Sequence, residues 1–267
     1  MWIHSSRHKN KYLYKGRLPF KKFVEIIKEA SKYHCPSLTI GGTSEPLLDE
    51  RTADMLSVAL EYGFVDTMIN TNATLLTPKI AKGLIKSGLG RLRIGFDGAT
   101  AETYEKIRKG ANFNIVKNNI INFIKLRNSM NSLLPVVRIS CVHLSENDAE
   151  INEFVKFWRP IVDYVSIQRY RPHDFSKERS REHLGAGKKT IRNLRCSQPF
   201  ERLYIRGDGD VHACCSIVYG PKVGNVFKSS LYDIWNSKRM KNIRKALKTG
   251  RLENLPTCRM CISKTFG

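Results

Sequence analysis

Apolar residues follow two periodicities along residues 18–170. Phe23, Ile26, Ile27 and Ala30 recur at helical spacing and predict a helix over Phe20–Tyr33. Short β-rich runs predict strands, and helical segments lie between them. The predicted strands are Ser37–Gly42, Val65–Asn70, Arg91–Phe96, Val136–Val142 and Asp163–Tyr170; the helices between them are Arg51–Tyr62, one opened by Thr77 and Pro78, one from Ala101, Phe113–Ser129 and one from Ser145. This alternation predicts an α/β fold with a parallel sheet, either open or curved into part of a barrel.

Polar residues follow the predicted strands at the ends where chemistry collects in such folds. Gly41 and Gly42 would let the backbone approach a ligand closely, and Glu45 would then offer a carboxylate. A plain turn with a solvated Glu45 explains these residues equally well. Asn70 and Asn72 fit helix capping better than ligand binding. The choice between a site and a turn stays open here.

Two charged residues extend this pattern. Asp97 and Gly98 form a dipeptide that is common in structural turns and equally suited to a functional turn. Arg138 lies within a strand among Val and Ile residues, so its charge needs a partner. That partner is either an internal carboxylate or an anionic ligand.

Residues 171–195 are polar and basic, and they read as a linker or an exposed loop. We therefore place a domain boundary near residue 190, with a larger domain over 1–190 and a smaller one over 191–267. No apolar run is long enough for a membrane span, and no signal-peptide core begins the chain. Seven cysteines without a secretion signal favour reduced thiols and a cytoplasmic location.

The chain carries 46 Lys and Arg against 24 Asp and Glu, a formal net charge of +22. Such an excess attracts nucleic acid or anionic substrates. The basic residues are nevertheless spread along the chain without a stripe of interleaved aromatics, which favours a solvated surface over a dedicated nucleic-acid face.

Five cysteines gather in the last third of the chain. Cys196, Cys214, Cys258 and Cys261 form a C-x17-C…C-x2-C arrangement, which suits four-thiolate binding of zinc or an iron–sulfur cluster. Buried structural cysteine is the alternative, and the C-x-x-C pair with two further cysteines argues against it. The segment from Leu203 to Cys215 reads as a hairpin that would bring Cys196 and Cys214 together. Cys215 would point the other way if the return strand continued.

These motifs, taken in order, resemble the radical S-adenosylmethionine (SAM) superfamily with a C-terminal SPASM-type auxiliary-cluster domain. The matching runs are GGTSEPLLDE from Gly41, INTNATLLT from Ile69, GFDGATAETYEKIRKG from Gly95, VRIS from Val137, CSQPFERLYIRGDGDVHACC from Cys196, GNVFKSSLYDIWNS from Gly224 and CRMC from Cys258. The resemblance implies a partial (β/α)6 barrel lacking its first strand. It also implies an oxidoreductase or modifying enzyme that acts on a peptide or a small carbohydrate-like molecule with an external electron donor.

The resemblance also implies the site residues. Glu45 would contact the amino group of the SAM methionine and Arg138 its carboxylate, while Gly41, Gly42, Asn72 and Asp97 would line the same cavity. Cys196, Cys214, Cys258 and Cys261 would hold an auxiliary 4Fe–4S cluster, and the family's Gly-x4-Cys pattern favours Cys214 over Cys215.

The sequence departs from the family at its N-terminus. The C-x3-C-x2-C motif that holds the SAM-cleaving cluster is absent, and Trp2 stands where its third cysteine would be. An indole does not ligate iron as a thiolate does. We therefore expect a truncated or degenerate relative that is inactive as this polypeptide alone. A non-catalytic iron–sulfur or zinc protein that contacts nucleic acid is the alternative.

Overall fold

The computed structural model describes residues 16–42, 44–170, 196–215 and 220–266. The described residues divide into two compact units, which we treat separately. The first comprises residues 30–170, and the second comprises residues 16–29 together with 196–266. The predicted linker over 171–195 lies outside the described residues, so the boundary at residue 190 stays a prediction.

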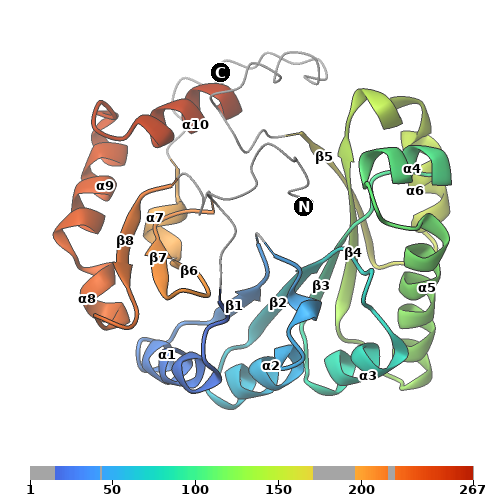
Figure 1. Ribbon diagram of the computed structural model, residues 1–267, viewed down its shortest axis with the longest axis horizontal. Coiled ribbons are helices and arrows are strands. Elements are labelled where there is room, and N and C mark those ends of the chain that lie inside the picture. Colours follow the sequence, from blue (N-terminus) through green and yellow to red (C-terminus); the bar gives the residue numbers. More distant parts are fainter. Residues whose placement is uncertain (1–15, 43, 171–195, 216–219, 267) are drawn as a thin grey trace. The chain divides into compact units, whose positions relative to one another are not determined.

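The first unit is built on a five-stranded parallel sheet in which the strand order follows the chain, β1-β2-β3-β4-β5. In Figure 1 this sheet curves, and α2, α3, α5 and α6 lie along its convex face. The strands are β1 (Ser37–Ile40), β2 (Asp66–Thr71), β3 (Arg91–Gly95), β4 (Val136–His143) and β5 (Tyr164–Arg169); the helices are α2 (Thr52–Glu61), α3 (Pro78–Lys86), α4 (Ala101–Ile107), α5 (Phe113–Ser129) and α6 (Ile151–Trp158), with the 3-10 turns η2 (Pro46–Leu48) and η3 (Ser145–Glu150). The predicted α/β class is confirmed, and the curved sheet is consistent with a partial barrel.

Local sequence explains where the helices of this unit begin. The Thr77 side chain accepts a hydrogen bond from the Ile80 backbone N–H, and Asn112 caps α5 through Ile115 in the same way at 2.9 Å. Ser145 was expected to open an α-helix, but residues 145–150 form the 3-10 turn η3, and α6 begins at Ile151. The α-helix therefore starts six residues later than predicted.

An aromatic cluster holds the outer helices on the sheet. Phe96 follows β3, and its ring stacks on Tyr104 of α4 at 4.3 Å between centroids. The same ring meets Phe113 of α5 and the edge of Trp158 of α6. All four side chains are buried, so one ring at the end of β3 joins three helices to the sheet.

The second unit holds a three-stranded antiparallel sheet in the order β6-β7-β8. Of α1 (Phe20–Lys32), the part up to Glu29 belongs to this unit. The unit further comprises α7 (Gln198–Glu201), β6 (Tyr204–Ile205), β7 (Asp210–His212), β8 (Lys222–Asn225), α8 (Leu231–Trp235), α9 (Lys238–Thr249) and α10 (Pro256–Phe266). The hairpin predicted from Leu203 is confirmed. Its return strand ends at His212, so Cys214 and Cys215 lie beyond the strand, and strand alternation does not orient them.

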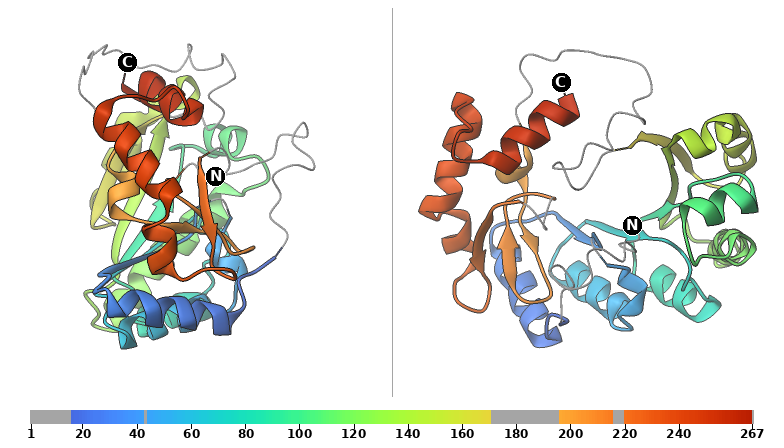
Figure 2. Two further views of the ribbon diagram at one scale, coloured as in Figure 1. Left: turned by 90° about the vertical axis from the view of Figure 1, so that its left-hand side faces the viewer. Right: turned by 45° about the horizontal axis from the view of Figure 1, so that its top comes forward.

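The core of the second unit includes a helix from near the start of the chain. Ile26 of α1 is buried in one cluster with Val211 of β7, Val223 of β8 and Met240 of α9. The backbone N–H of Tyr232 also donates to Glu29 of α1 at 3.1 Å. Figure 2 shows α1 in two further views together with the small sheet. The sequence alone did not indicate that α1 packs with residues nearly 200 positions away.

Candidate functional site

The end of β1 passes close to β2. Gly41 has φ +116° and Gly42 has φ +153°, a region that favours glycine. A Cβ at Gly41 would lie 2.9 Å from the backbone oxygen of Asn70, so this position excludes a side chain. Gly41 therefore serves the close approach of β1 to β2, while a Cβ at Gly42 would meet no atom within 4 Å and only its φ favours glycine. The role of the double glycine in admitting a ligand stays a prediction.

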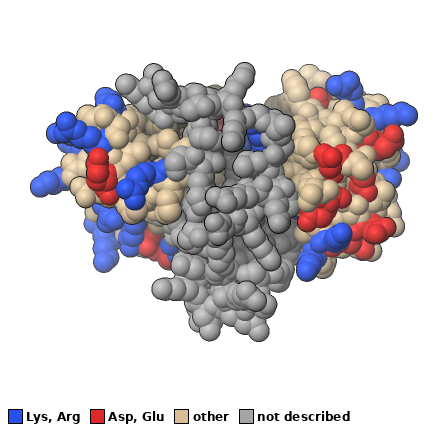
Figure 3. Space-filling model, turned by 90° about the horizontal axis from the view of Figure 1, so that it is seen from above, with Lys and Arg blue, Asp and Glu red and all other residues tan. Residues whose placement is uncertain are grey.

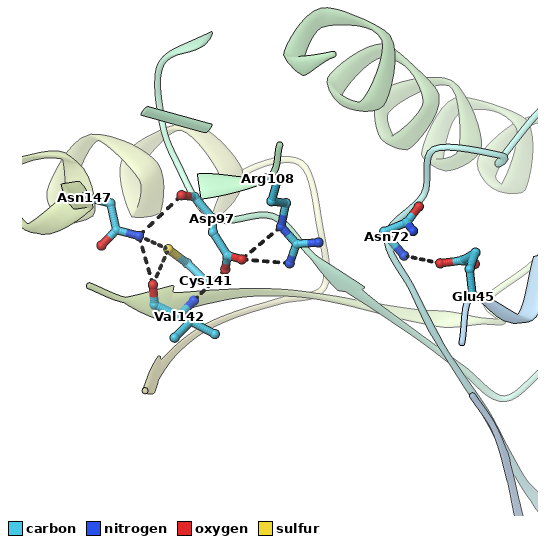
Figure 4. Close-up of polar contacts among 7 residues, drawn as sticks. All are labelled: Glu45, Asn72, Asp97, Arg108, Cys141, Val142 and Asn147. Atoms are coloured by element: carbon cyan, nitrogen blue, oxygen red, sulfur yellow. Dashed lines mark hydrogen bonds and ion pairs between the residues drawn. The ribbon is translucent and has the colours of Figure 1, made fainter. Parts of the chain in front are cut away.

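The Glu45 carboxylate joins the ends of β1 and β2. One oxygen accepts hydrogen bonds from the Thr71 hydroxyl at 2.6 Å and the Leu47 backbone N–H at 3.2 Å. The other oxygen accepts from the backbone N–H of Asn72 at 2.8 Å (Figure 4). The side chain is half-buried and caps η2. A plain turn with a solvated Glu45 is therefore wrong.

Asn72 makes a local turn where a helix cap was favoured. Its side-chain oxygen accepts from the Thr74 backbone N–H at 2.8 Å, while α3 is capped by Thr77. Such a turn orients the residue at the end of β2. Asn72 and Glu45 are thus brought together, and their shared place in a SAM cavity stays a prediction.

Asp97 is buried and paired within the protein. Its Oδ2 accepts from Arg108 Nε at 2.9 Å and forms an ion pair with the second guanidinium nitrogen at 2.8 Å. Its Oδ1 accepts from the Val142 backbone N–H at 2.7 Å, which ties the end of β3 to β4 (Figure 4). With both oxygens engaged and 6% of the residue exposed, Asp97 has a structural role. Its place in the lining of the SAM cavity stays a prediction.

Cys141 belongs to the same buried cluster. The side-chain amide of Asn147 donates to Cys141 Sγ at 3.4 Å and to the Val142 oxygen at 2.9 Å. Burial, together with the nearby Asp97 carboxylate, raises the pKa of Cys141 to about 12. The thiol is therefore neutral at physiological pH and packs as a small apolar group.

Arg138 lies on β4 between the buried residues Val137 and Ile139. Strand alternation places it on the sheet face opposite the helices. One guanidinium nitrogen donates to the Ser166 hydroxyl on β5. Among the described residues, no carboxylate forms an ion pair with Arg138. Of the two partners predicted for its charge, an internal carboxylate is thus not found in the described part of the chain.

Arg93 is a charged strand residue beside Arg138 that the sequence analysis did not single out. It pairs in register with Arg138 and alternates with the buried residues Leu92 and Ile94. The same signal that singled out Arg138, a charge alternating with apolar strand residues, was present in the run RLRIGF. Burial and then the positive charge of Arg138 lower the pKa of Arg93.

Several thiols of the second unit raise one another's pKa values. Burial, followed by the neighbouring Cys196 and Cys261, raises the pKa of Cys258 to about 11. The pKa of Cys196 is raised mainly by burial, with contributions from Cys261 and Cys215. Cys196, Cys258 and Cys261 are thus gathered in one region, with Cys258 and Cys261 on α10. Cys215 contributes to the raised pKa of Cys196, so Cys215 and Cys214 are both candidates for the fourth ligand.

A four-thiol donor set fits an iron–sulfur cluster or zinc. Within the described residues, no three His, Cys, Asp or Glu side chains are already arranged to hold a metal ion. Raised thiol pKa values mean that a metal would have to displace protons to bind. The chemistry of the donor set therefore fits the group, and ligand assignment stays a prediction.

Two family models match this chain. The radical SAM superfamily model covers residues 4–157, and the SPASM model, an iron–sulfur cluster-binding domain, covers residues 196–262. The mycofactocin maturase MftC of Mycobacterium tuberculosis is 27% identical over 157 residues, which are 59% of this chain and 38% of that protein. The matched segments cover 26% to 38% of the first curated relatives.

Solved structures share the fold. SuiB of Streptococcus suis bound to SAM has a TM-score of 0.65 at 18% identity, covering 85% of this chain and 60% of SuiB. The enzyme anSMEcpe with bound SAM has a TM-score of 0.65 at 12% identity, covering 98% of this chain and 83% of that chain. No helix in the described part of the chain is both long and apolar enough to cross a bilayer.

Proposed function

This chain belongs to the radical SAM superfamily and carries a SPASM region, and from that premise we propose that it binds SAM at the strand ends of its parallel sheet, that its lineage is one of peptide-modifying enzymes, and that this polypeptide alone does not cleave SAM. The observation that carries the proposal is the Glu45 carboxylate, which is held at the ends of β1 and β2 by Thr71 and Asn72. Gly41 and Gly42 lie just before it in the chain.

We propose that the amino group and the carboxylate of the SAM methionine are each bound by a residue of opposite charge. Glu45 accepts hydrogen bonds from the amino group, and Arg138, which has no counter-charge among the described residues, holds the carboxylate. Asn72 orients the backbone N–H that fixes Glu45. In the family, one electron from a cluster held by the C-x3-C-x2-C motif would cleave SAM to methionine and a 5′-deoxyadenosyl radical, and that radical would abstract a hydrogen atom from the substrate.

We assign the auxiliary 4Fe–4S cluster to Cys196, Cys258, Cys261 and one of the adjacent pair Cys214 and Cys215. Thiolates are the ligands that such clusters take in proteins, and the mutual influence of these thiols supports a common site. The cluster would serve substrate binding or electron transfer.

A peptide is the substrate class that several of the matched proteins support. SuiB has been solved with its precursor peptide SuiA, and anSMEcpe with the Cp18Cys peptide. The relative MftC is a maturase.

The prediction that this polypeptide alone does not cleave SAM rests on the missing C-x3-C-x2-C motif. It is tested by assaying 5′-deoxyadenosine formation with dithionite as reductant, and product formation would overturn it.

SAM binding tests the assigned residues. Isothermal titration calorimetry should show that Glu45→Gln and Arg138→Gln each weaken SAM binding about tenfold or more, because each removes a charge-assisted hydrogen bond. Glu50→Gln is the matched control, since Glu50 is an exposed carboxylate in the same segment. Unchanged SAM affinity in both variants would show that Glu45 and Arg138 do not bind SAM.

Metal analysis tests the cluster. After anaerobic purification we expect about four irons and four sulfides per chain, lost on Cys258→Ala. Cys214→Ala and Cys215→Ala, made singly, should show which of the two cysteines is the ligand. The variant that lacks the ligand should lose iron, and the other variant should keep its full iron content. Zinc without iron would overturn the cluster assignment and favour a zinc-binding protein.

A further inference from the structure

One polar row crosses the sheet on the face opposite the helices. Strand register aligns Asn70 of β2 with Arg93 of β3, Arg93 with Arg138 of β4, and Arg138 with Tyr164 of β5. The residues on either side of Arg93 and Arg138 along their strands are buried against the helices. The row therefore lies where a ligand over the concave face would meet it.

The two arginines of this row are half-buried neighbours on adjacent strands, whose backbones lie about 4.8 Å apart. Arg138 donates to Ser166, while no hydrogen bond or ion pair of the Arg93 side chain is found within the described residues. Two like charges held side by side repel each other, which is consistent with the lowered pKa of Arg93.

The carboxylates around the sheet have other partners. Asp66 pairs with Arg91, Asp97 with Arg108, and Asp163 with Arg127. Their engagement leaves the Arg93 and Arg138 charges without compensation from these groups. A half-buried charge without compensation is unfavourable for folding alone, and an anionic ligand would compensate it.

A further polar group on this face also lacks a partner. Ser140 lies two residues after Arg138 on β4, and its hydroxyl is buried without a hydrogen-bond partner in the described part of the chain. By strand alternation it shares the face of Arg138. An unsatisfied buried hydroxyl marks a place where a water or a ligand atom is expected.

We propose that Arg93 binds an anionic oxygen group of the substrate, a carboxylate or a phosphate, beside the SAM carboxylate held by Arg138. This inference rests on the proposed function. A guanidinium presents parallel N–H donors that match two oxygens of either group, and the side-chain amide of Asn70 adjoins it on β2. For a peptide substrate, the anionic group is an acidic side chain or the terminal carboxylate.

The test titrates the SAM-saturated full chain with sodium acetate and, separately, with inorganic phosphate, against sodium chloride of equal ionic strength. Calorimetry should show saturable binding of one of the two anions. Arg93→Gln should weaken it about tenfold or more while leaving SAM affinity within about twofold. Arg91→Gln is the matched control, because Arg91 lies on the same strand and is already paired with Asp66.

Three results would overturn the proposal. One is the absence of saturable binding for both anions, and another is an anion affinity unchanged in Arg93→Gln. The third is a loss of SAM affinity in Arg93→Gln as large as that in Arg138→Gln, which would mean that both arginines hold the SAM carboxylate. If the wild-type chain does not bind SAM, the proposed function fails instead, and the same titrations of the SAM-free chain still decide whether Arg93 binds an anion.

Thermal unfolding separates binding from a structural role. Arg93→Gln should leave the melting temperature unchanged or raise it, because it removes an uncompensated charge. Acetate or phosphate should raise the melting temperature of the wild-type chain but not of the variant. A clear fall in the melting temperature of the variant without added anion would assign Arg93 to the fold.

Discussion

Asp97 and Glu45 both end strands of the parallel sheet, yet their surroundings give them different roles. Asp97 is buried against Arg108, and both of its oxygens are engaged. Glu45 is half-buried and accepts hydrogen bonds from Thr71 and Asn72 at the end of β2 and from Leu47 in η2. The sequence indicated both residues through their positions after strands, but Arg108, eleven residues further on, could not be recognised as the partner of Asp97 before the fold was known.

Asp97→Ala tests the structural role at this scale. We expect a loss of about 3–5 kcal/mol in the free energy of unfolding, because Arg108 would remain buried without a counter-charge. Urea unfolding followed by circular dichroism measures it. Asp66→Ala is the control, since its ion pair with Arg91 is exposed and should contribute about 0–1 kcal/mol. Equal losses in the two variants would contradict the assignment.

At the scale of elements, periodicity predicted the parallel sheet closely. The strand Val65–Asn70 was expected where β2 spans Asp66–Thr71, and Arg91–Phe96 where β3 spans Arg91–Gly95. Alternation of buried and polar residues explains this agreement. Packing partners were not predictable, because the apolar stripe of α1 is equally suited to any complementary surface. β8 also escaped prediction, since its four residues include Gly224 and carry little pattern.

Ile26→Ala tests the packing of α1. Ile26 is buried with Val211, Val223 and Met240, so we expect a loss of about 2–5 kcal/mol. Hydrogen-exchange mass spectrometry should show reduced protection over β6, β7 and β8, with β2 to β4 unchanged. Lys21→Ala on the exposed face of α1 is the control. Reduced protection confined to β2 to β4 would contradict the packing.

At the scale of the molecule, the net charge of +22 is unevenly distributed along the sequence. Residues 30–170 hold 17 Lys and Arg against 14 Asp and Glu, a net charge of +3, and the remaining residues hold 29 against 10. On the face drawn in Figure 3, Lys and Arg are interspersed with Asp and Glu. The excess positive charge is thus carried mainly outside residues 30–170, and a solvated surface stays the prediction favoured over a dedicated nucleic-acid face.

Nucleic-acid binding should therefore be weak and non-specific. Fluorescence anisotropy with labelled duplex DNA should show affinity that falls steeply between 50 and 200 mM salt, because such binding comes from counterion release. Two duplexes of unrelated sequence serve as each other's control. Retention of binding to one of them at 200 mM salt would contradict this expectation.

The hydrogen bonds of Glu45 have a further consequence for ligand affinity. Thr71, Asn72 and Leu47 fix the carboxylate before any ligand arrives, so the conformational entropy of ordering this side chain is lost during folding and not on binding. Thr71→Val would remove one of these restraints without touching the ligand. Its effect on affinity would therefore measure how much preorganisation contributes.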